Sequence, residues 1–341
     1  MALIEGFRVQ NYRALRDVTL GKLSSQQGGA PLTPFTVVIG KNGVGKSTLF
    51  DAFGFVADCL AHDVEQACDM KQRGGYERLH SRGTEGPIRF EIYYREAAGE
   101  RPMTYELAIA LDATGRPFIE SEVLRQRRKG QSYGRPYPFL RLNHGKGVVW
   151  AGEEAVEVEG GEEDRAQTVV ELTDLRQLGI ATLGTLKEHP RIKRFRDFLK
   201  GWYLSYFYPD AARSLPTAGP QKHLNSHGDN IGNVVQFMAR EHKDRFKAVL
   251  DRIAAKIPGI TSIDTQETLD KRLLLRFNDG AFADPFFAQQ MSDGTLKVFA
   301  YLLLMDDPEP PPFICIEEPE NGLYHNCLLY TSDAADERSS V

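Results

Sequence analysis

The residues with the clearest chemical pattern are a lysine and a serine that follow a glycine-rich stretch. Residues 40–47 read GKNGVGKS and fit the pattern G-x-x-x-x-G-K-[ST] at every fixed position. In such a loop, successive backbone N–H groups point at phosphate oxygens, and the helix behind it adds its positive end. The pattern predicts a nucleoside triphosphate site in which Lys46 reaches the β- and γ-phosphates and acts in catalysis, and Ser47 ligates Mg²⁺. The predicted nucleotide-binding residues are Gly40, Asn42, Gly43, Val44, Gly45, Lys46, Ser47 and Thr48.

The flanks of this loop favour a strand before it and a helix after it. Residues 35–39 form a short apolar run, as expected of a buried strand in a parallel sheet. From Leu49 to Leu60, apolar residues recur at helical spacing. A strand, a loop and a helix in this order are the context that the motif requires.

Two adjacent glutamates, Glu317 and Glu318, end a second apolar run, residues 313–316. A purely structural strand seldom ends in two carboxylates, and we expect this end to meet the phosphates at the carboxyl edge of the sheet. We predict that Glu317 ligates Mg²⁺ and its waters and that Glu318 is the catalytic general base. The alternative is a capping role for the pair.

A serine and a glycine stand before the last helical pattern of the chain. Residues 291–297 read MSDGTLK, and apolar residues follow at helical spacing up to Leu303. At a helix N-terminus Ser292 and Gly294 can bind an anion, although alone they would make an ordinary N-cap. Because the segment stands between the glycine-rich loop and the two glutamates, we predict a second phosphate-binding element here.

The order of the motifs, GKNGVGKST, then MSDGTLK, then ICIEEPENGLYH, resembles the ATP-binding-cassette (ABC) heads of the RecF and SMC type. More narrowly, it resembles the RecF-related AAA-family ATPases of bacteria and archaea. The opening FRVQNYRALRDVTL is similar to the first strands of that family, so the resemblance spans most of residues 1–326. Two departures are Glu317, where SMC heads usually have aspartate, and the absence of long heptad arms in residues 88–255.

The resemblance implies an ATPase that uses ATP and Mg²⁺ and closes into an ATP-dependent homodimer. Ser292, Asp293 and Gly294 would be the signature, which acts in trans on the γ-phosphate bound by the opposite protomer. Two ATP molecules would then hold a two-fold dimer together. Gln167 and Gln177 are candidates for the family's glutamine-loop residue.

Together the patterns predict an α/β fold, a P-loop NTPase of the ABC-ATPase head type. We expect a mixed or parallel core sheet with the P-loop, an antiparallel β meander and a helical signature lobe. A period of two at 88–94 and 103–111 predicts the meander, with further strands near 117–124, 137–142 and 147–150. Further predicted elements are helices at 187–200 and 231–257 and a strand at 202–207. The single head, 1–326, would comprise 1–165 (P-loop and antiparallel sheet), 166–300 (helices and signature) and 301–326 (return to the core).

Residues 327–341, CLLYTSDAADERSSV, break the pattern where a further helix and strand should follow. Residues 327–337 resemble the translation of a transposase-type library adapter, and a natural tail is the alternative. We therefore expect the gene to continue beyond about residue 326, where the family's switch histidine would lie, and we exclude this tail from fold reasoning. The truncated chain is expected to be inactive.

The composition is that of a soluble globular protein, with 41% hydrophobic and 26% charged residues. The apolar runs are too short for a bilayer, the start lacks a signal-peptide pattern, and four cysteines lack CxxC spacing. These features predict a cytoplasmic protein without membrane contact. The net charge of −5 leaves only a local patch for DNA, such as the basic residues 125–129, which more often form a solvated turn. His223 and His227 lie in a loop without a third ligand, so a metal pair there is not expected.

The expected function is Mg²⁺-dependent ATP hydrolysis coupled to dimer closure, with a role in DNA repair or phage defence by family analogy. One rival is a nucleotide-gated binding module that regulates a toprim-type nuclease from a neighbouring gene, with little turnover. A transporter ATPase is a weaker rival, since SDG replaces the SGGQ sequence.

Overall fold

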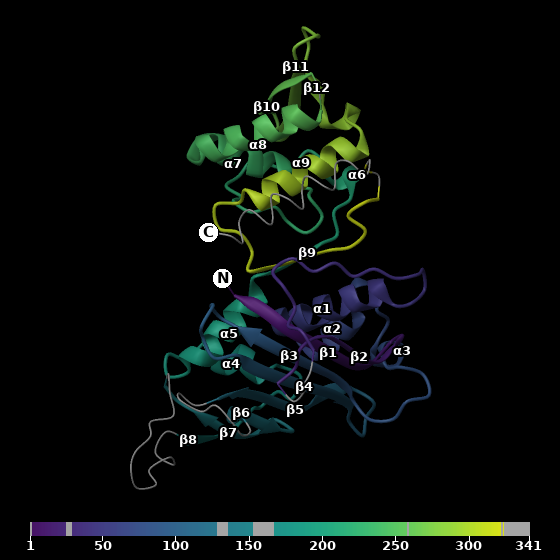
Figure 1. Ribbon diagram of the computed structural model, residues 1–341, viewed down its shortest axis with the longest axis vertical. Coiled ribbons are helices and arrows are strands. Elements are labelled where there is room, and N and C mark those ends of the chain that lie inside the picture. The colour runs from purple at the N-terminus through teal and green to yellow at the C-terminus, as the bar shows by residue number, and fades with distance from the viewer. Residues whose placement is uncertain are drawn as a thin grey trace. The chain divides into compact units, whose positions relative to one another are not determined.

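The computed structural model describes residues 2–24, 29–127, 136–152, 167–257, 259–321 and 323. The predicted tail, 327–341, and the basic residues Arg128 and Lys129 lie outside this described part. The chain divides into two compact units, Met1–Trp202 and Tyr203–Val341 (Figure 1).

The first unit contains an eight-stranded antiparallel sheet, in the order β2-β1-β3-β4-β5-β6-β7-β8. Its strands are β1 (Leu3–Tyr12), β2 (Leu15–Gly21), β3 (Ile88–Arg95), β4 (Met103–Leu111), β5 (Pro117–Gln126), β6 (Tyr137–Asn143), β7 (Lys146–Trp150) and β8 (Gln167–Glu171). The predicted meander is confirmed, because β3 to β7 pair in sequence order. Alternate residues along β3 are buried, as the period of two predicts.

Helices cover one face of this sheet (Figure 1). They are α1 (Lys46–Ala61), α2 (Val64–Asp69), α3 (Tyr76–Leu79), α4 (Gly179–Leu183) and α5 (Pro190–Lys200), with a short 3₁₀ turn, η1 (Met70–Gln72). The Phe53 ring of α1 stacks on Phe7 of β1 at 4.1 Å between centroids, and Phe198 of α5 stacks on Tyr94 of β3 at 4.2 Å. Helices α4 and α5 also contact α1, and the first compact unit extends to Trp202.

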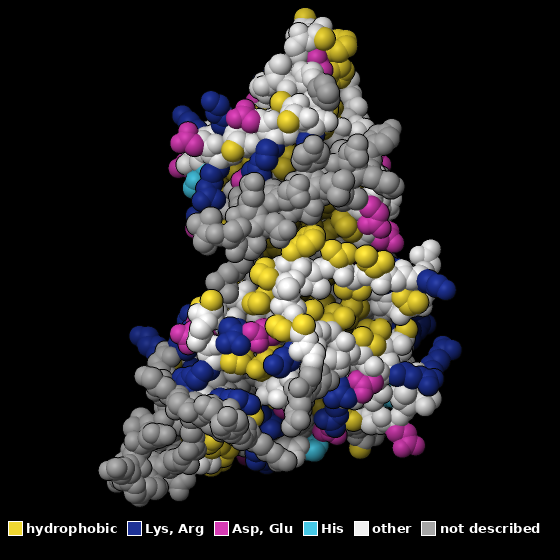
Figure 2. All heavy atoms as spheres, in the orientation of Figure 1, with side chains coloured by type: hydrophobic (Ala, Val, Ile, Leu, Met, Phe, Trp, Pro, Cys, Tyr) yellow, Lys and Arg dark blue, Asp and Glu magenta, His cyan; other side chains and the backbone are white. Residues whose placement is uncertain are grey.

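The segment before α1 differs from the sequence prediction. Residues 35–39 form no strand and pair with none of the described strands. Their apolar side chains Phe35, Val37, Val38 and Ile39 are between 46% and 90% exposed. Figure 2 shows hydrophobic side chains gathered on the surface over the segment that leads into α1. The prediction of a buried parallel strand is wrong for this structure, because an apolar run becomes a strand only where a neighbouring strand accepts its hydrogen bonds.

The second unit contains both helices and strands. Its elements are β9 (Trp202–Ser205, which begins at the last residue of the first unit), α6 (Pro209–Ala212), α7 (Ile231–Glu241), α8 (Lys243–Lys256), β10 (Ile260–Glu267), β11 (Leu273–Asp279), β12 (Phe286–Phe287), the 3₁₀ turn η3 (Ala288–Gln290), α9 (Asp293–Met305) and β13 (Phe313–Ile316). Strands β10, β11 and β12 form a small sheet that the sequence analysis did not predict, and β13 pairs with β9. The predicted strand near 202, the helices at 231–257 and after Ser292, and the strand 313–316 are confirmed.

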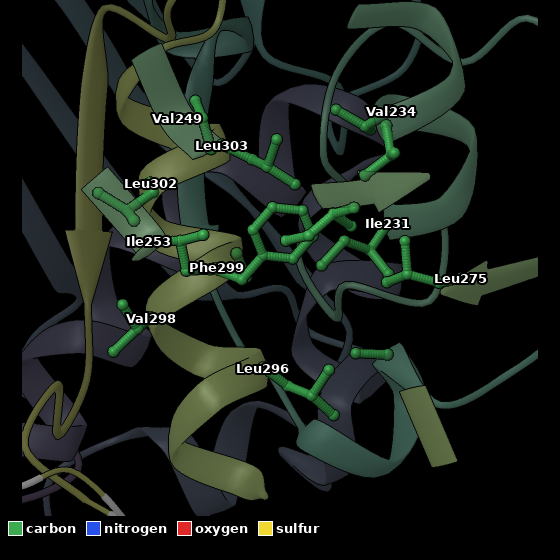
Figure 3. Packing of buried hydrophobic residues seen from close by; sticks show 14 of the residues in the cluster. Ile231, Val234, Val249, Ile253, Leu275, Leu296, Val298, Phe299, Leu302 and Leu303 are labelled. Carbon is green, nitrogen blue, oxygen red and sulfur yellow. The ribbon is translucent and has the colours of Figure 1, made fainter. Parts of the chain in front are cut away.

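Helix α9 runs through the core of the second unit (Figure 3). Leu296, Phe299 and Leu303 point from one side of α9 toward Ile231 and Leu275. Val298 and Leu302 point from the opposite side, and they are buried as well. A helix that is apolar on several sides must be enclosed by its neighbours, so α9 is the central element of this unit.

Candidate functional site

The glycine-rich loop ends where α1 begins, and two of its glycines have left-handed backbone. Gly43 has φ 82° and Gly45, the residue before α1, has φ 102°. A Cβ atom at Gly45 would lie 3.0 Å from Leu15 Cδ2, so a side chain there would meet both strain and crowding. The loop thus needs glycine at this position of the motif for a physical reason.

Lys46, the first residue of α1, folds back over the loop. Its Nζ donates hydrogen bonds to the carbonyl oxygens of Gly40 at 2.7 Å and of Lys41 at 3.0 Å. The ammonium group is therefore held at the start of the loop, and the loop residues Asn42, Gly43 and Val44 are exposed. A positive charge beside a curled loop at a helix N-terminus is suited to bind a phosphate group.

The residues around the start of α1 fit a bound nucleoside triphosphate. A Cβ atom at Gly43 would meet nothing within 4 Å, so the approach to the loop backbone is open. Ser47 is exposed on the first turn of α1, and Thr48 is half-buried beside it. The loop, the Lys46 ammonium and the Ser47 hydroxyl thus offer the donors and the ligand that the sequence analysis predicted for a triphosphate with Mg²⁺.

A cluster of charges anchors α1 one turn behind Ser47, and the sequence analysis missed it. The Asp51 carboxylate accepts hydrogen bonds from Tyr12 Oη at 2.7 Å and Arg73 Nε at 2.9 Å, and Arg13 pairs with it at 3.0 Å. Arg73 also donates to Asp58, on the same helix, at 2.6 Å. Burial and the Asp51 carboxylate raise the pKa of Tyr12, which therefore stays protonated as a donor. These contacts connect the helix behind the loop to β1 and to the segment around Arg73.

The predicted signature lies at the N-terminus of α9 in the second unit. Ser292 Oγ accepts a hydrogen bond from the Thr295 backbone N–H at 3.2 Å, as an N-cap residue does. Arg213, which follows α6, is hydrogen-bonded to the residues on both sides of Ser292. Its guanidinium donates to the Met291 carbonyl at 2.8 Å and to the Asp293 carboxylate at 2.5 Å. The arginine thereby balances the charge of Asp293.

The predicted carboxylates follow β13 in the same unit. Glu317 is half-buried; burial and then the charge of Glu317 raise the pKa of the Cys315 thiol to about 12. Glu318 is exposed, and its φ of 45° lies in the left-handed region. The Asn321 N–H donates to the Glu318 carbonyl at 3.1 Å, which closes a turn, and Lys297 of α9 donates to the same carbonyl at 2.9 Å.

The structure thus gathers the predicted residues in two groups. The loop residues 40–48 lie together in the first unit, and residues 292–294 and 317–318 lie in the second. Within the described ranges, no group of three or more His, Cys, Asp or Glu side chains could hold a metal ion by itself. His223 instead pairs with Asp307 at 2.8 Å. No helix in the described part of the chain is long and apolar enough to cross a membrane.

Fold and loop together define an α/β protein with a P-loop NTPase motif. Comparison with protein families agrees: residues 35–330 match the family described as "AAA domain, putative AbiEii toxin, Type IV TA system". The match covers far more than half of the chain, so the chain belongs to this AAA family, a family of P-loop ATPase domains. No curated protein matches the chain. The AAA and P-loop part of the predicted resemblance is confirmed, and the family implies nucleotide binding, usually with Mg²⁺.

Proposed function

We propose that this protein is a Mg²⁺-dependent ATPase of the RecF and SMC type that hydrolyses ATP as part of a closing dimer. The observation that carries the proposal is the phosphate loop. In it Lys46, the first residue of α1, donates hydrogen bonds from Nζ to the carbonyl oxygens of Gly40 and Lys41. The family match supports the ATPase class.

In the proposed mechanism, the backbone N–H groups of residues 42–48 and the Lys46 ammonium bind the triphosphate and orient it. Ser47 is a residue that would hold Mg²⁺, which supplies positive charge to the phosphate oxygens when it is bound. The Glu318 carboxylate orients the attacking water and takes its proton. Lys46 and Ser47 thus act from the loop and the start of α1, and Glu318 acts from the turn after β13.

The signature residues act in trans in this proposal. Ser292 and Gly294 would contact the γ-phosphate bound by the other protomer, so that ATP closes the dimer. The support is the capped N-terminus of α9 and the neutralisation of Asp293 by Arg213, because an unbalanced carboxylate would repel a phosphate. A cellular role in DNA repair or phage defence belongs to the proposal by resemblance alone.

The first test removes the charge at the centre of the loop. We expect Lys46→Ala to weaken the binding of a fluorescent ATP analogue to the full-length protein about tenfold to a hundredfold, since a hydrogen bond to a charged group contributes about 1.5–3 kcal/mol. Lys41→Ala is the matched control, because only the Lys41 carbonyl takes part in the loop contact. Equal affinities of the Lys46→Ala and Lys41→Ala variants would contradict the assignment of the loop.

The second test concerns the carboxylates. Glu318→Gln should keep ATP bound but slow its hydrolysis by about 10²–10⁴-fold, because it removes the base and keeps the shape. The same variant should accumulate as an ATP-dependent dimer. Light scattering that shows only monomer at saturating ATP would count against the action of the signature in trans.

A further inference from the structure

Lys297 is a charged residue inside the most apolar helix of the second unit. It stands between the buried Leu296 and Val298 of α9 and is itself only 8% exposed. Its Nζ donates to two backbone carbonyls, those of Glu318 and Asn321, both at 2.9 Å. Burying an ammonium group is costly unless it is hydrogen-bonded, so these two contacts hold the side chain in one place.

The two carbonyls belong to the turn that follows β13. The Asn321 N–H closes this turn on the Glu318 carbonyl, so Lys297 and Asn321 share one acceptor. Glu318 has a left-handed backbone, which is strained for a residue other than glycine and persists only where the surroundings enforce it. The Lys297 ammonium is one of the groups that enforce it here.

Electrostatics around Lys297 also favour its place beside the turn. Burial lowers the pKa of Lys297, and the carboxylates of Glu320 and Glu318 oppose this effect. Nζ further lies 6.0 Å from the centroid of the Tyr301 ring, one turn along α9. The positive charge is thus enclosed by an aromatic face, two carbonyl oxygens and nearby acidic residues.

The same helix carries the signature residues. Ser292, the N-cap of α9, precedes Lys297 by five positions, which corresponds to about 7.5 Å along the helix. Arg213 holds the signature turn, and the buried side chains of α9 hold the helix in the core. A shift of the α9 N-terminus would therefore move the Lys297 ammonium, and with it the backbone of Glu318.

We propose that Lys297 is a positioning residue that joins the signature helix to the turn carrying Glu318 and sets the direction of the Glu318 carboxylate. The inference rests on the proposed function, because it assigns Glu318 as the general base. Lys297 itself acts only through the turn and makes no contact with the nucleotide in this proposal.

The test compares Lys297→Met, which keeps the length and apolar stem but removes the ammonium, with Lys247→Met on the exposed side of α8. In the full-length protein, Lys297→Met should lower the ATP turnover number at least tenfold and change the affinity for a fluorescent ATP analogue less than threefold. Lys247→Met should change neither quantity. An unchanged turnover of the Lys297→Met variant would overturn the proposal.

A purely structural role is separated by a double-mutant comparison. In a Glu318→Gln background, adding Lys297→Met should change the residual rate less than twofold, because the carboxylate that Lys297 directs is gone. An equal loss in both backgrounds would mean that Lys297 only supports the fold, and would overturn the proposal. If Lys297→Met lacks a cooperative unfolding transition, the comparison is made with Lys297→Arg, which keeps the charge but displaces the donors. We expect this variant to be at least threefold slower, again only where Glu318 is present.

The outcomes also distinguish the inference from the proposed function. If Glu318→Gln keeps wild-type turnover, the assignment of the general base fails. If Glu318→Gln is slow but Lys297→Met is not, the general base stands and only the positioning role fails.

Discussion

Replacing Arg73 by methionine tests whether the charge cluster behind the phosphate loop holds α1 in place. The Arg73 side chain is fully buried and donates to the carboxylates of Asp51 and Asp58, both on α1, and to the Ala67 carbonyl at 2.9 Å. Its guanidinium carbon also lies 5.4 Å from the centroid of the Phe55 ring. Arg73→Met keeps an apolar stem of similar length but leaves two acidic residues without their shared partner.

The magnitude follows from what remains in the cluster. Removing one partner of a buried ion pair costs about 3–5 kcal/mol. Asp51 keeps the Tyr12 hydroxyl and Arg13, and Asp58 keeps Lys71 at 3.0 Å, so we expect the lower end of this range. A loss of about 3 kcal/mol lowers the Tm of a unit of this size by about 6–12 °C.

The assay is urea and thermal unfolding of the full-length protein at pH 7, followed by nucleotide titration of each folded variant. Arg8→Met is the matched control, because Arg8 pairs with Asp17 on the solvent-exposed face of the sheet and such pairs contribute about 0–1 kcal/mol. We expect Arg73→Met also to weaken ATP-analogue binding, since α1 carries Lys46 and Ser47. A stability loss no larger than that of Arg8→Met would refute the reasoning.

Two further predictions concern other buried or functional charges. Burial raises the pKa of the Glu122 carboxyl to about 7, against the opposing hydrogen bonds from the Ile180 and Gly179 N–H groups and Tyr105. Glu122 thus binds its proton more tightly in the folded state than in the unfolded state, where its pKa is near 4.5. The protonated carboxyl therefore stabilises the fold fully below about pH 4.5, and this stabilisation is lost as pH rises through about 7. The pKa shift corresponds to a decline of about 3 kcal/mol in the free energy of unfolding, and Glu122→Gln should abolish this decline. The measurement is urea unfolding at pH 4.5, 7 and 8.5. An unaltered dependence of the free energy of unfolding on pH would show that another group causes the decline. Arg213→Gln should weaken ATP-dependent dimerisation in light scattering about tenfold while changing stability by less than about 1 kcal/mol, and adding Asp293→Asn should restore the dimer. No restoration by the second substitution would exclude charge compensation as the role of Arg213.

The parts of the site that the sequence determined are local. Three features depend only on residues within one or two turns along the chain. They are the left-handed backbone at Gly43 and Gly45, the start of α1 at Lys46, and the N-cap at Ser292. The antiparallel meander was also predictable, because the alternation along β3 directly reflects burial on one face. A similar alternation of Leu273, Leu275 and Phe277 on β11 was available in the sequence and was missed.

Tertiary structure decided which distant groups meet. The apolar run 35–39 has the composition of a buried strand, yet strand formation depends on a neighbour, and residues 35–39 have none among the described strands. The partners of Asp51, Asp293 and Glu318 are arginines and a lysine 21–80 positions away along the chain. Single-sequence patterns report spacing along one element and carry no information on such pairings. Lys297, within the apolar stretch of α9, was a local sign of such a distant pairing. A buried charge needs a partner, and only the folded chain can supply it.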